Sequence, residues 1–281
     1  MERIKQAVAK ARQQQSEYRG AQANSPAPTR HVKINTQHSP APTQLNDIES
    51  VEYRHTRVVP LSASHLEQQR IVGHDKMHPA SQAIDLLRTQ VLQKMEEKGW
   101  RTLAITSPNA DAGKTTVAIN LVMSIAHQTQ KTAMLVDLDL RKPNVSSYLG
   151  LPEHLSLNEV LDGSANVPEA LINPDIPRLV ILPTQHPVAR PAEILSSAKI
   201  GNLISELRAR YDSRIVIFDL PPLLNTDDAI AVLPQIDCVL LVVGEGMSSK
   251  PEIADCLRHL PAENLLGVVL NKAEIETKTY Y

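Results

Sequence analysis

The sequence predicts an α/β fold in which helices cover both faces of a doubly wound, mostly parallel sheet. Short apolar segments of strand length alternate with helical segments between residues 100 and 271, and this alternation is typical of parallel sheets. The segment 238–243 is apolar on every residue, as expected for a strand covered on both faces. In such sheets ligands bind beyond the carboxyl ends of the strands, so we expect the chemistry there.

Composition and charge narrow the class of protein. The chain has 281 residues, with Lys+Arg 29 against Asp+Glu 31 and a formal net charge of -2, whereas nucleic-acid-binding proteins usually carry a basic excess. Its two cysteines, Cys238 and Cys256, exclude a disulfide framework and fit a reducing cytoplasm. No apolar stretch approaches the ~18 residues that a membrane span needs. We therefore expect a cytoplasmic protein with no transmembrane segment of its own and no nucleic-acid partner.

Two unlike regions precede the predicted sheet. Residues 1–15 are predicted to form a short helix, which is either solvated or a docking element for a partner. Residues 16–50 are rich in Gln, Ser, Thr and Pro, and the pentapeptide Ser-Pro-Ala-Pro-Thr occurs twice within them. Such a segment cannot bury enough apolar surface to offset its ordering entropy, which predicts a disordered linker. The predicted domain covers residues 51–275, and a tail at 276–281 follows it.

The predicted domain contains one long helix followed by alternating strands and helices. A helix is predicted over 81–98, because four apolar residues recur there at helical spacing and Gly99 stands where a helix C-terminal glycine belongs. Beyond Trp100, strands are predicted at 102–106, 132–137, 178–183, 214–219, 238–243 and 265–271. The helices between them are predicted at 114–128, 201–211, 228–233 and 250–260.

The loop after the first of these strands carries a phosphate-binding pattern. Residues 107–116 read Ser-Pro-Asn-Ala-Asp-Ala-Gly-Lys-Thr-Thr, and a helix follows. In this context backbone N–H groups and the helix N-terminus cradle phosphates, a lysine reaches the β- and γ-phosphates, and a hydroxyl binds Mg²⁺. We expect these roles for Lys114 and Thr115. The loop itself is completed by three neighbours, Ala112, Gly113 and Thr116.

The loop departs from the full pattern G-x-x-x-x-G-K-[ST]. The chain has Gly 10 in all, where average usage would give roughly 20, and this loop retains one of them. Pro108 stands where the first glycine belongs, and Asp111 lies three residues before Lys114. Aspartate tolerates a left-handed backbone better than most residues, so the loop can form. Its carboxylate repels a triphosphate unless it points to solvent, which leaves the affinity for nucleotide open.

Three aspartates follow two of the buried strands. Asp137 and Asp139 come at the end of the strand 132–137, and Asp219 ends the strand 214–219. A single aspartate after a strand is ordinarily a helix cap or a turn residue. Parallel strands, however, bring all three to the edge of the sheet that carries the phosphate loop, where carboxylates suit Mg²⁺ and a γ-phosphate. The sequence therefore predicts a nucleotide site with ATP and Mg²⁺ as cofactors.

These motifs together resemble a known family. Asp-Leu-Asp-Leu-Arg-Lys-Pro at 137–143, Asp-Leu-Pro-Pro at 219–222 and the phosphate loop resemble the bacterial tyrosine kinases of capsule and exopolysaccharide loci. These BY-kinases, which are CpsD/CapB-like, are relatives of the MinD/ParA ATPases. The segments 191–197 and 226–229 are similar to the branch associated with exosortase-linked exopolysaccharide clusters. The resemblance covers residues 80–275 and implies a P-loop NTPase fold with protein-tyrosine autokinase activity.

The resemblance implies a role for each motif residue. Lys114 and Thr115 would hold the phosphates and Mg²⁺, while Asp139 and Asp219 would support the metal directly or through water. Asp137 would face the incoming tyrosine hydroxyl and orient or deprotonate it. Phosphoryl transfer depends mostly on positioning and charge neutralisation, so these few groups suffice.

Alternatives stay open at the remaining positions. Arg141 contacts phosphate or a neighbouring subunit, or else it forms a salt bridge with a local carboxylate. Asn271 ends a strand at the ligand edge, where relatives bind the adenine. Asp227 and Asp228 either cap a helix or support the metal from outside its first coordination sphere. Asn109 stands where plain MinD/ParA ATPases usually carry an extra lysine, which separates this chain from them.

The resemblance also implies the phosphate acceptor. Kinases of this family phosphorylate a tyrosine cluster at their own C-terminus, and Tyr280 and Tyr281 are two of the six tyrosines in this chain. Nine residues follow Lys272, a reach of at most ~30 Å when extended. We therefore expect autophosphorylation in trans, with the tail of one subunit in the site of another.

Three functions remain open. The first is an autokinase that controls polysaccharide polymerisation or export. The second is a nucleotide-dependent regulatory or scaffold subunit without meaningful kinase activity, and the third is a MinD/ParA-like ATPase. The expected partner is the cytosolic segment of a membrane polysaccharide chain-length determinant (a Wzz-like co-polymerase), which would hold the protein peripherally at the inner membrane. A homo-oligomer is also expected, although of the family's Glu-x-x-Arg-x-x-Arg pattern only Arg88 matches here.

Overall fold

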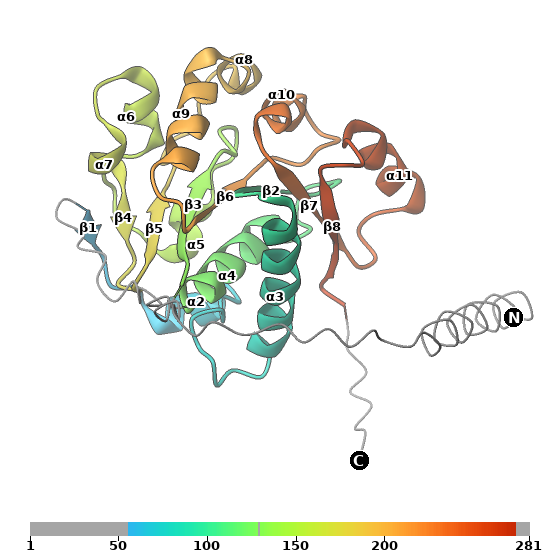
Figure 1. The fold of residues 1–281 in the computed structure, drawn as a ribbon, viewed down its shortest axis with the longest axis horizontal. Helices are drawn as coiled ribbons and strands as arrows, with labels where there is room; N and C mark the ends of the chain where they lie inside the picture. Colours follow the sequence, from blue (N-terminus) through green and yellow to red (C-terminus); the bar gives the residue numbers. More distant parts are fainter. Residues whose placement is uncertain (1–55, 129, 274–281) are drawn as a thin grey trace, which may run out of the picture. The chain divides into compact units, whose positions relative to one another are not determined.

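Eight strands form one sheet in the computed structural model, which describes residues 56–128 and 130–273 (Figure 1). Their order along the sheet is β1 (Arg57–Val58), β4 (Ile172–Asn173), β5 (Leu179–Leu182), β3 (Thr132–Asp137), β6 (Arg214–Asp219), β2 (Thr102–Thr106), β7 (Cys238–Gly244) and β8 (Leu265–Asn271). Every pairing is parallel except that of β4 with β5. The predicted mostly parallel sheet is therefore confirmed.

Helices cover both faces of this sheet (Figure 1). One face carries α2 (Ala63–Gln68), α3 (Ser81–Lys98), α4 (Lys114–Ala126) and α5 (Val145–Leu149). The other carries α6 (Leu157–Asp162), α7 (Val167–Ala170), α8 (Pro191–Leu195), α9 (Ala198–Ala209), α10 (Asp228–Val232) and α11 (Lys250–His259), with a short 3-10 helix, η1 (Leu233–Gln235), after α10. Because side chains alternate along a strand, Leu103 and Ile105 of β2 join the first core and Ala104 joins the second.

The apolar patterns of the sequence predicted where the longer helices and strands lie. Strands β2, β3, β6 and β8 begin and end at the predicted residues, and α3 ends at Lys98 with Gly99 as its C-cap, whose φ of 68° is left-handed. Helix α9 begins three residues before its predicted start, because the Ser197 side chain accepts a hydrogen bond from the backbone N–H of Ile200 and caps it. The elements that the prediction missed are β1, β4, α2 and α5 to α8. Each of them has at most six residues, too few to show a period.

Helix α4 is the most buried helix near the site. All of its residues except Thr116 are buried, because the helix is apolar on most sides and packs beneath the sheet. It begins at Lys114, directly after the loop that leaves β2. Its N-terminus therefore lies at the carboxyl end of the central strands, where the sequence predicts the ligand.

Several predicted features lie outside the described residues. These are the helix 1–15, the linker 16–50 and the tail 276–281 with Tyr280 and Tyr281. Among the residues that the structure describes, no helix has the length and apolar character needed to cross a membrane.

The packing of β6 leads to a test of stability. Phe218 is the one phenylalanine of the chain, and its side chain is fully buried in the core on the α6–α11 face. Phe218→Ala leaves a cavity there, so we expect the free energy of unfolding to fall by about 3–5 kcal/mol in urea denaturation. Leu270→Ala in β8 is the control, because Leu270 is 59% exposed, and it should cost less than about 0.5 kcal/mol. Equal losses in the two variants would contradict the core assignment.

Candidate active site

The phosphate loop joins β2 to α4 and has the backbone that its sequence requires. Gly113 has a φ of 89° and Asp111 a φ of 63°, so both are left-handed. Gly113 also leaves room for the side chain of Asn271, since a Cβ there would lie 2.2 Å from Nδ2 of Asn271. That Nδ2 donates a hydrogen bond to the carbonyl of Ala112 at 2.9 Å. The predicted tolerance of Asp111 for this backbone is confirmed, and its side chain is exposed.

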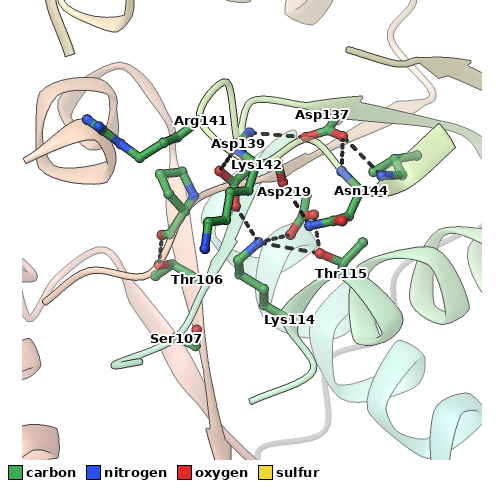
Figure 2. A network of polar contacts seen from close by, with 12 residues as sticks. Thr106, Ser107, Lys114, Thr115, Asp137, Asp139, Arg141, Lys142, Asn144 and Asp219 are labelled. Atoms are coloured by element: carbon green, nitrogen blue, oxygen red, sulfur yellow. Dashed lines mark hydrogen bonds and ion pairs between the residues drawn. The ribbon is translucent and has the colours of Figure 1, made fainter. Parts of the chain in front are cut away.

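Four predicted residues meet at the start of α4 (Figure 2). Nζ of Lys114 lies 2.9 Å from Oδ2 of Asp139 and 3.6 Å from Oδ1 of Asp219. The Thr115 hydroxyl donates a hydrogen bond of 2.6 Å to Oδ2 of Asp219. All four side chains are buried. The carboxyl ends of β3 and β6 and the N-terminus of α4 thus bring these groups together, as the sequence predicts.

Burial and charge together determine the protonation of this cluster. Burial alone would lower the pKa of Lys114, but the carboxylates of Asp219 and Asp139 outweigh it and raise the pKa above its ordinary value. Burial raises the pKa of Asp219, while Lys114 and the Thr115 hydroxyl act in the opposite direction. The lysine is therefore held as a cation between two carboxylates, in a position where it can exchange them for phosphate oxygens.

Asp137 lies behind the cluster and holds the backbone. Its Oδ1 accepts a hydrogen bond from the N–H of Asp139 at 3.1 Å, and its Oδ2 accepts from Asn144 at 3.1 Å and Val145 at 3.0 Å. Burial raises the pKa of Asp137, and the neighbouring Asp219 adds to this. The carboxylate therefore fixes the turn from β3 into α5 (Figure 2). Its role toward a tyrosine hydroxyl stays a prediction.

The oxygen donors of the cluster fit Mg²⁺. Oδ1 of Asp219 is buried and has no hydrogen-bond partner, although its other oxygen holds the Thr115 hydroxyl. Mg²⁺ is usually bound through one or two carboxylates together with substrate phosphates and water. In the described part of the chain no group of three or more His, Cys, Asp or Glu side chains could hold a metal by itself. Asp219, Thr115 and Asp139 therefore suit an ion that arrives with its nucleotide.

A cavity of about 560 Å³ opens over these residues. Its walls come from the phosphate loop with the start of α4, from the segment 139–144, from the segment 221–226 and from Lys272. Asp139 lines the cavity, whereas Asp137 and Asp219 lie behind its wall. The sequence did not predict two further parts of the lining, residues 68–70 and Tyr148, because they belong to no motif and to helices too short to show a period.

Arg141 forms the local salt bridge that was one of its two alternatives. Its Nε and Nη2 donate hydrogen bonds to the two carboxylate oxygens of Asp228 at 2.9 Å and 3.1 Å. Asp228 is fully buried and also accepts a bond of 3.0 Å from the Thr226 hydroxyl. Asp227 precedes α10 without a side-chain capping bond. The Asp-Leu-Asp-Leu-Arg motif is thereby tied to the start of α10, while Arg141 still lines the cavity.

Asn109 connects the phosphate loop to a distant helix. Its Nδ2 donates a hydrogen bond of 2.9 Å to Oε1 of Glu252, whose other oxygen accepts from the backbone N–H of Ser249 in the capping box of α11. These hydrogen bonds lower the pKa of Glu252. Asn109 is therefore part of the loop's support in this fold.

Known proteins match both the sequence and the fold. Residues 100–256, more than half of the chain, match the family described as AAA domain. The tyrosine-protein kinase YwqD of Bacillus subtilis (strain 168) is 31% identical over 197 residues, which cover 69% of this chain and 82% of YwqD. EpsB of Ralstonia solanacearum is 28% identical over 204 residues, and the chain spans 27% of its length.

Solved structures place the fold among the same proteins. The kinase domain of the Escherichia coli tyrosine kinase ETK is 25% identical, and the match covers 80% of this chain and 91% of that one with a TM-score of 0.68. The septum site-determining protein MinD of Pyrococcus horikoshii OT3, solved with Mg-ADP, is also 25% identical. That match covers 60% of this chain and 69% of the other, with a TM-score of 0.50. The P-loop fold that the resemblance implied is confirmed.

The hydrogen bonds of Asp137 generate a test that needs no ligand. In Asp137→Asn the amide nitrogen replaces one acceptor oxygen, so at least one buried backbone N–H faces another donor. We expect the free energy of unfolding to fall by about 1–3 kcal/mol, measured by urea denaturation without nucleotide. Asp227→Asn is the control, because Asp227 is exposed and its side chain caps nothing, and it should stay near the wild type. An Asp137→Asn variant as stable as the wild type would show that this carboxylate does not hold the turn.

Proposed function

The chain belongs to the family of bacterial tyrosine-protein kinases built on a P-loop AAA domain, and on that premise we propose that it is an ATP-dependent protein-tyrosine autokinase. One observation carries the proposal. The lysine and hydroxyl of the phosphate loop meet the carboxylates of Asp139 and Asp219 beneath a single cavity. This is the set of groups that phosphoryl transfer from Mg²⁺–ATP uses for positioning and for charge neutralisation.

The proposed reaction transfers the γ-phosphoryl group to a tyrosine hydroxyl. The tyrosine oxygen forms a bond to the γ-phosphorus, the bond from that phosphorus to the β,γ-bridging oxygen breaks, and ADP leaves. The hydroxyl proton passes to a carboxylate, a role proposed for Asp137. Lys114 holds the β- and γ-phosphates, and the backbone of Ala112, Gly113, Thr115 and Thr116 cradles them. Mg²⁺, when bound at Thr115, Asp139 and Asp219, neutralises charge on the phosphates.

The rest of the proposed site follows the edge of the sheet. Asn271 ends β8 against the phosphate loop, a position that supports adenine binding beside it. Arg141, fixed by Asp228, lines the cavity, where it is proposed to contact phosphate or a neighbouring subunit. The proposed acceptors are Tyr280 and Tyr281 of a neighbouring subunit, which requires a homo-oligomer. This assignment rests on the family resemblance.

The proposed setting is polysaccharide export. The protein would act in the cytoplasm, held at the inner membrane by the cytosolic segment of a membrane polysaccharide chain-length determinant, and its phosphorylation state would regulate polymerisation and export. A second function, a nucleotide-dependent regulatory or scaffold subunit, is favoured by one observation. Asp111 places a carboxylate at the cavity wall beside the phosphate loop, where its negative charge would oppose triphosphate binding.

Phosphotyrosine analysis tests the activity and the acceptors. Purified protein is incubated with Mg²⁺–ATP, with and without the partner's cytosolic segment, and phosphotyrosine is located by mass spectrometry. We expect modification of Tyr280 and Tyr281 in the wild type, none in Lys114→Met, and none in the Tyr280→Phe/Tyr281→Phe double variant. Wild-type phosphorylation of the double variant would refute the acceptor assignment. Bound ATP without phosphotyrosine in either condition would refute the kinase and support the regulatory subunit.

A second test concerns the carboxylate of the phosphate loop. Asp111→Gly removes a negative charge from the cavity, and glycine adopts the left-handed backbone of this position without strain. We expect the affinity for Mg²⁺–ATP to rise about two- to fivefold, as for an exposed charge pair, in isothermal titration calorimetry. Asp175→Gly is the matched control, because Asp175 is also exposed and left-handed, with a φ of 60°, but lies outside the cavity. Unchanged or lower affinity in Asp111→Gly would show that this carboxylate does not repel the triphosphate.

A further inference from the structure

One wall of the cavity comes from a segment that precedes the predicted motifs by about 40 residues. Helix α2 and the turn after it place Gln68, Gln69 and Arg70 along the same cavity as Lys114 and Thr116. Nothing in the phosphate-loop, Asp-Leu-Asp or Asp-Leu-Pro-Pro motifs accounts for this wall. It is the part of the cavity whose role the proposed mechanism leaves unassigned.

A buried amide fixes this wall to the helix that carries the phosphate loop. Oδ1 of Asn120 in α4 accepts hydrogen bonds from the backbone N–H groups of Val72 and Gly73, both at 2.7 Å. Nδ2 of Asn120 donates to the carbonyl of Arg70 at 3.1 Å and to that of Thr116 at 2.8 Å. One side chain therefore joins the backbone of Arg70 to the first turn of α4, where phosphate-binding N–H groups lie.

Close packing makes the wall part of the domain core. At Gly73 a Cβ would lie 2.3 Å from the carbonyl oxygen of Asn120, so the segment and α4 are in direct backbone contact. Leu66 and Ile71, on either side of the wall residues, are buried in the core cluster that includes α4. A ring nitrogen of His65 lies 2.9 Å from the carbonyl oxygen of Ser147 in α5. The position of Arg70 is thus fixed from both sides.

Arg70 keeps a long side chain on a backbone that favours glycine. Its φ is 58°, one of six positive values among the described residues other than glycine. Three of these six, Arg70, Asp111 and Lys272, line this cavity. Strained backbone of this kind persists where the surrounding structure holds it, and it gathers at functional sites. The wall therefore brings a guanidinium to the cavity from a strained backbone position.

Arg70 differs from two other cations that line the cavity, Lys114 and Arg141, because their charges are paired with carboxylates. Lys114 is paired with Asp139 and Asp219, and Arg141 with Asp228. In the described part of the chain no ion pair involves Arg70, and its side chain is exposed at the cavity. A guanidinium offers planar, paired donors that match phosphate oxygens.

We propose that Arg70 is a nucleotide-binding residue whose guanidinium contacts the phosphates of the nucleotide in the phosphate loop. The wall formed by Gln68, Gln69 and Arg70, the α2 wall, is then a part of the nucleotide site that none of the sequence motifs contains. This inference rests on the proposed function, because it assumes that the cavity takes a nucleoside triphosphate. It adds to that function a binding group supplied by the segment before the strand–helix repeat.

Calorimetric titration of the full chain with the magnesium complex of a non-hydrolysable ATP analogue tests the inference. We expect Arg70→Gly to weaken binding at least tenfold. Glycine suits the left-handed backbone, so the thermal midpoint of this variant should not fall below that of the wild type. Arg70→Lys keeps the charge without the paired donors and should lose less, about threefold.

Arg190→Gly is the matched control. Arg190 is also exposed and left-handed, with a φ of 54°, but it precedes α8 and does not line the cavity. It should bind within twofold of the wild type. If the wild type binds the analogue and Arg70→Gly binds within twofold of it, or if Arg190→Gly loses as much, the inference is overturned while the proposed function stands. If the wild type binds no nucleotide, the proposed function itself fails.

Discussion

The site depends on one interaction, the pairing of the Lys114 ammonium with two carboxylates at once. The ammonium lies between Asp139 and Asp219, two carboxylates delivered by different strands of one parallel sheet. Without the lysine, the negative charges at this edge would repel one another in a buried setting, where an unpaired charge is costly. With it, the two carboxylates lie together in the arrangement that the proposed metal and phosphate site requires. The topology makes this possible because parallel strands end at the same edge.

The two aspartates of the Asp-Leu-Asp motif face in different directions. Asp137 turns inward and satisfies three backbone N–H groups of the segment that leads into α5. Asp139 turns toward the cavity and the lysine. The inner carboxylate sets where the outer one lies, because it binds the backbone N–H of Asp139 itself. The salt bridge of Arg141 with the buried Asp228 then anchors the far end of the motif.

The phosphate loop compensates for its single glycine through contacts from distant elements. Asn271 of β8 holds the Ala112 carbonyl, Glu252 of α11 holds the Asn109 amide, and Asp111 adopts the left-handed backbone that a second glycine would otherwise supply. Asn120 of α4 in turn binds the backbone of Arg70, Val72 and Gly73. The loop is thus supported by parts of the chain that lie far apart in sequence, which allows a glycine-poor segment to keep a phosphate-binding shape.

Local pattern by itself determined the fold class, the central strands and the residues at their carboxyl ends. Apolar runs and helical periods are properties of neighbouring residues, and Gly113, Lys114, Thr115 and the three aspartates stand at strand or helix ends that those periods locate. Only the tertiary structure decided which of these carboxylates faces the cavity, that Arg141 pairs with a residue 87 positions away, and that α2 forms a wall. Such contacts depend on how segments that are distant in sequence pack against each other. The periodicity of apolar residues reports only on neighbouring residues, so it cannot show which distant residue becomes a partner when the chain folds.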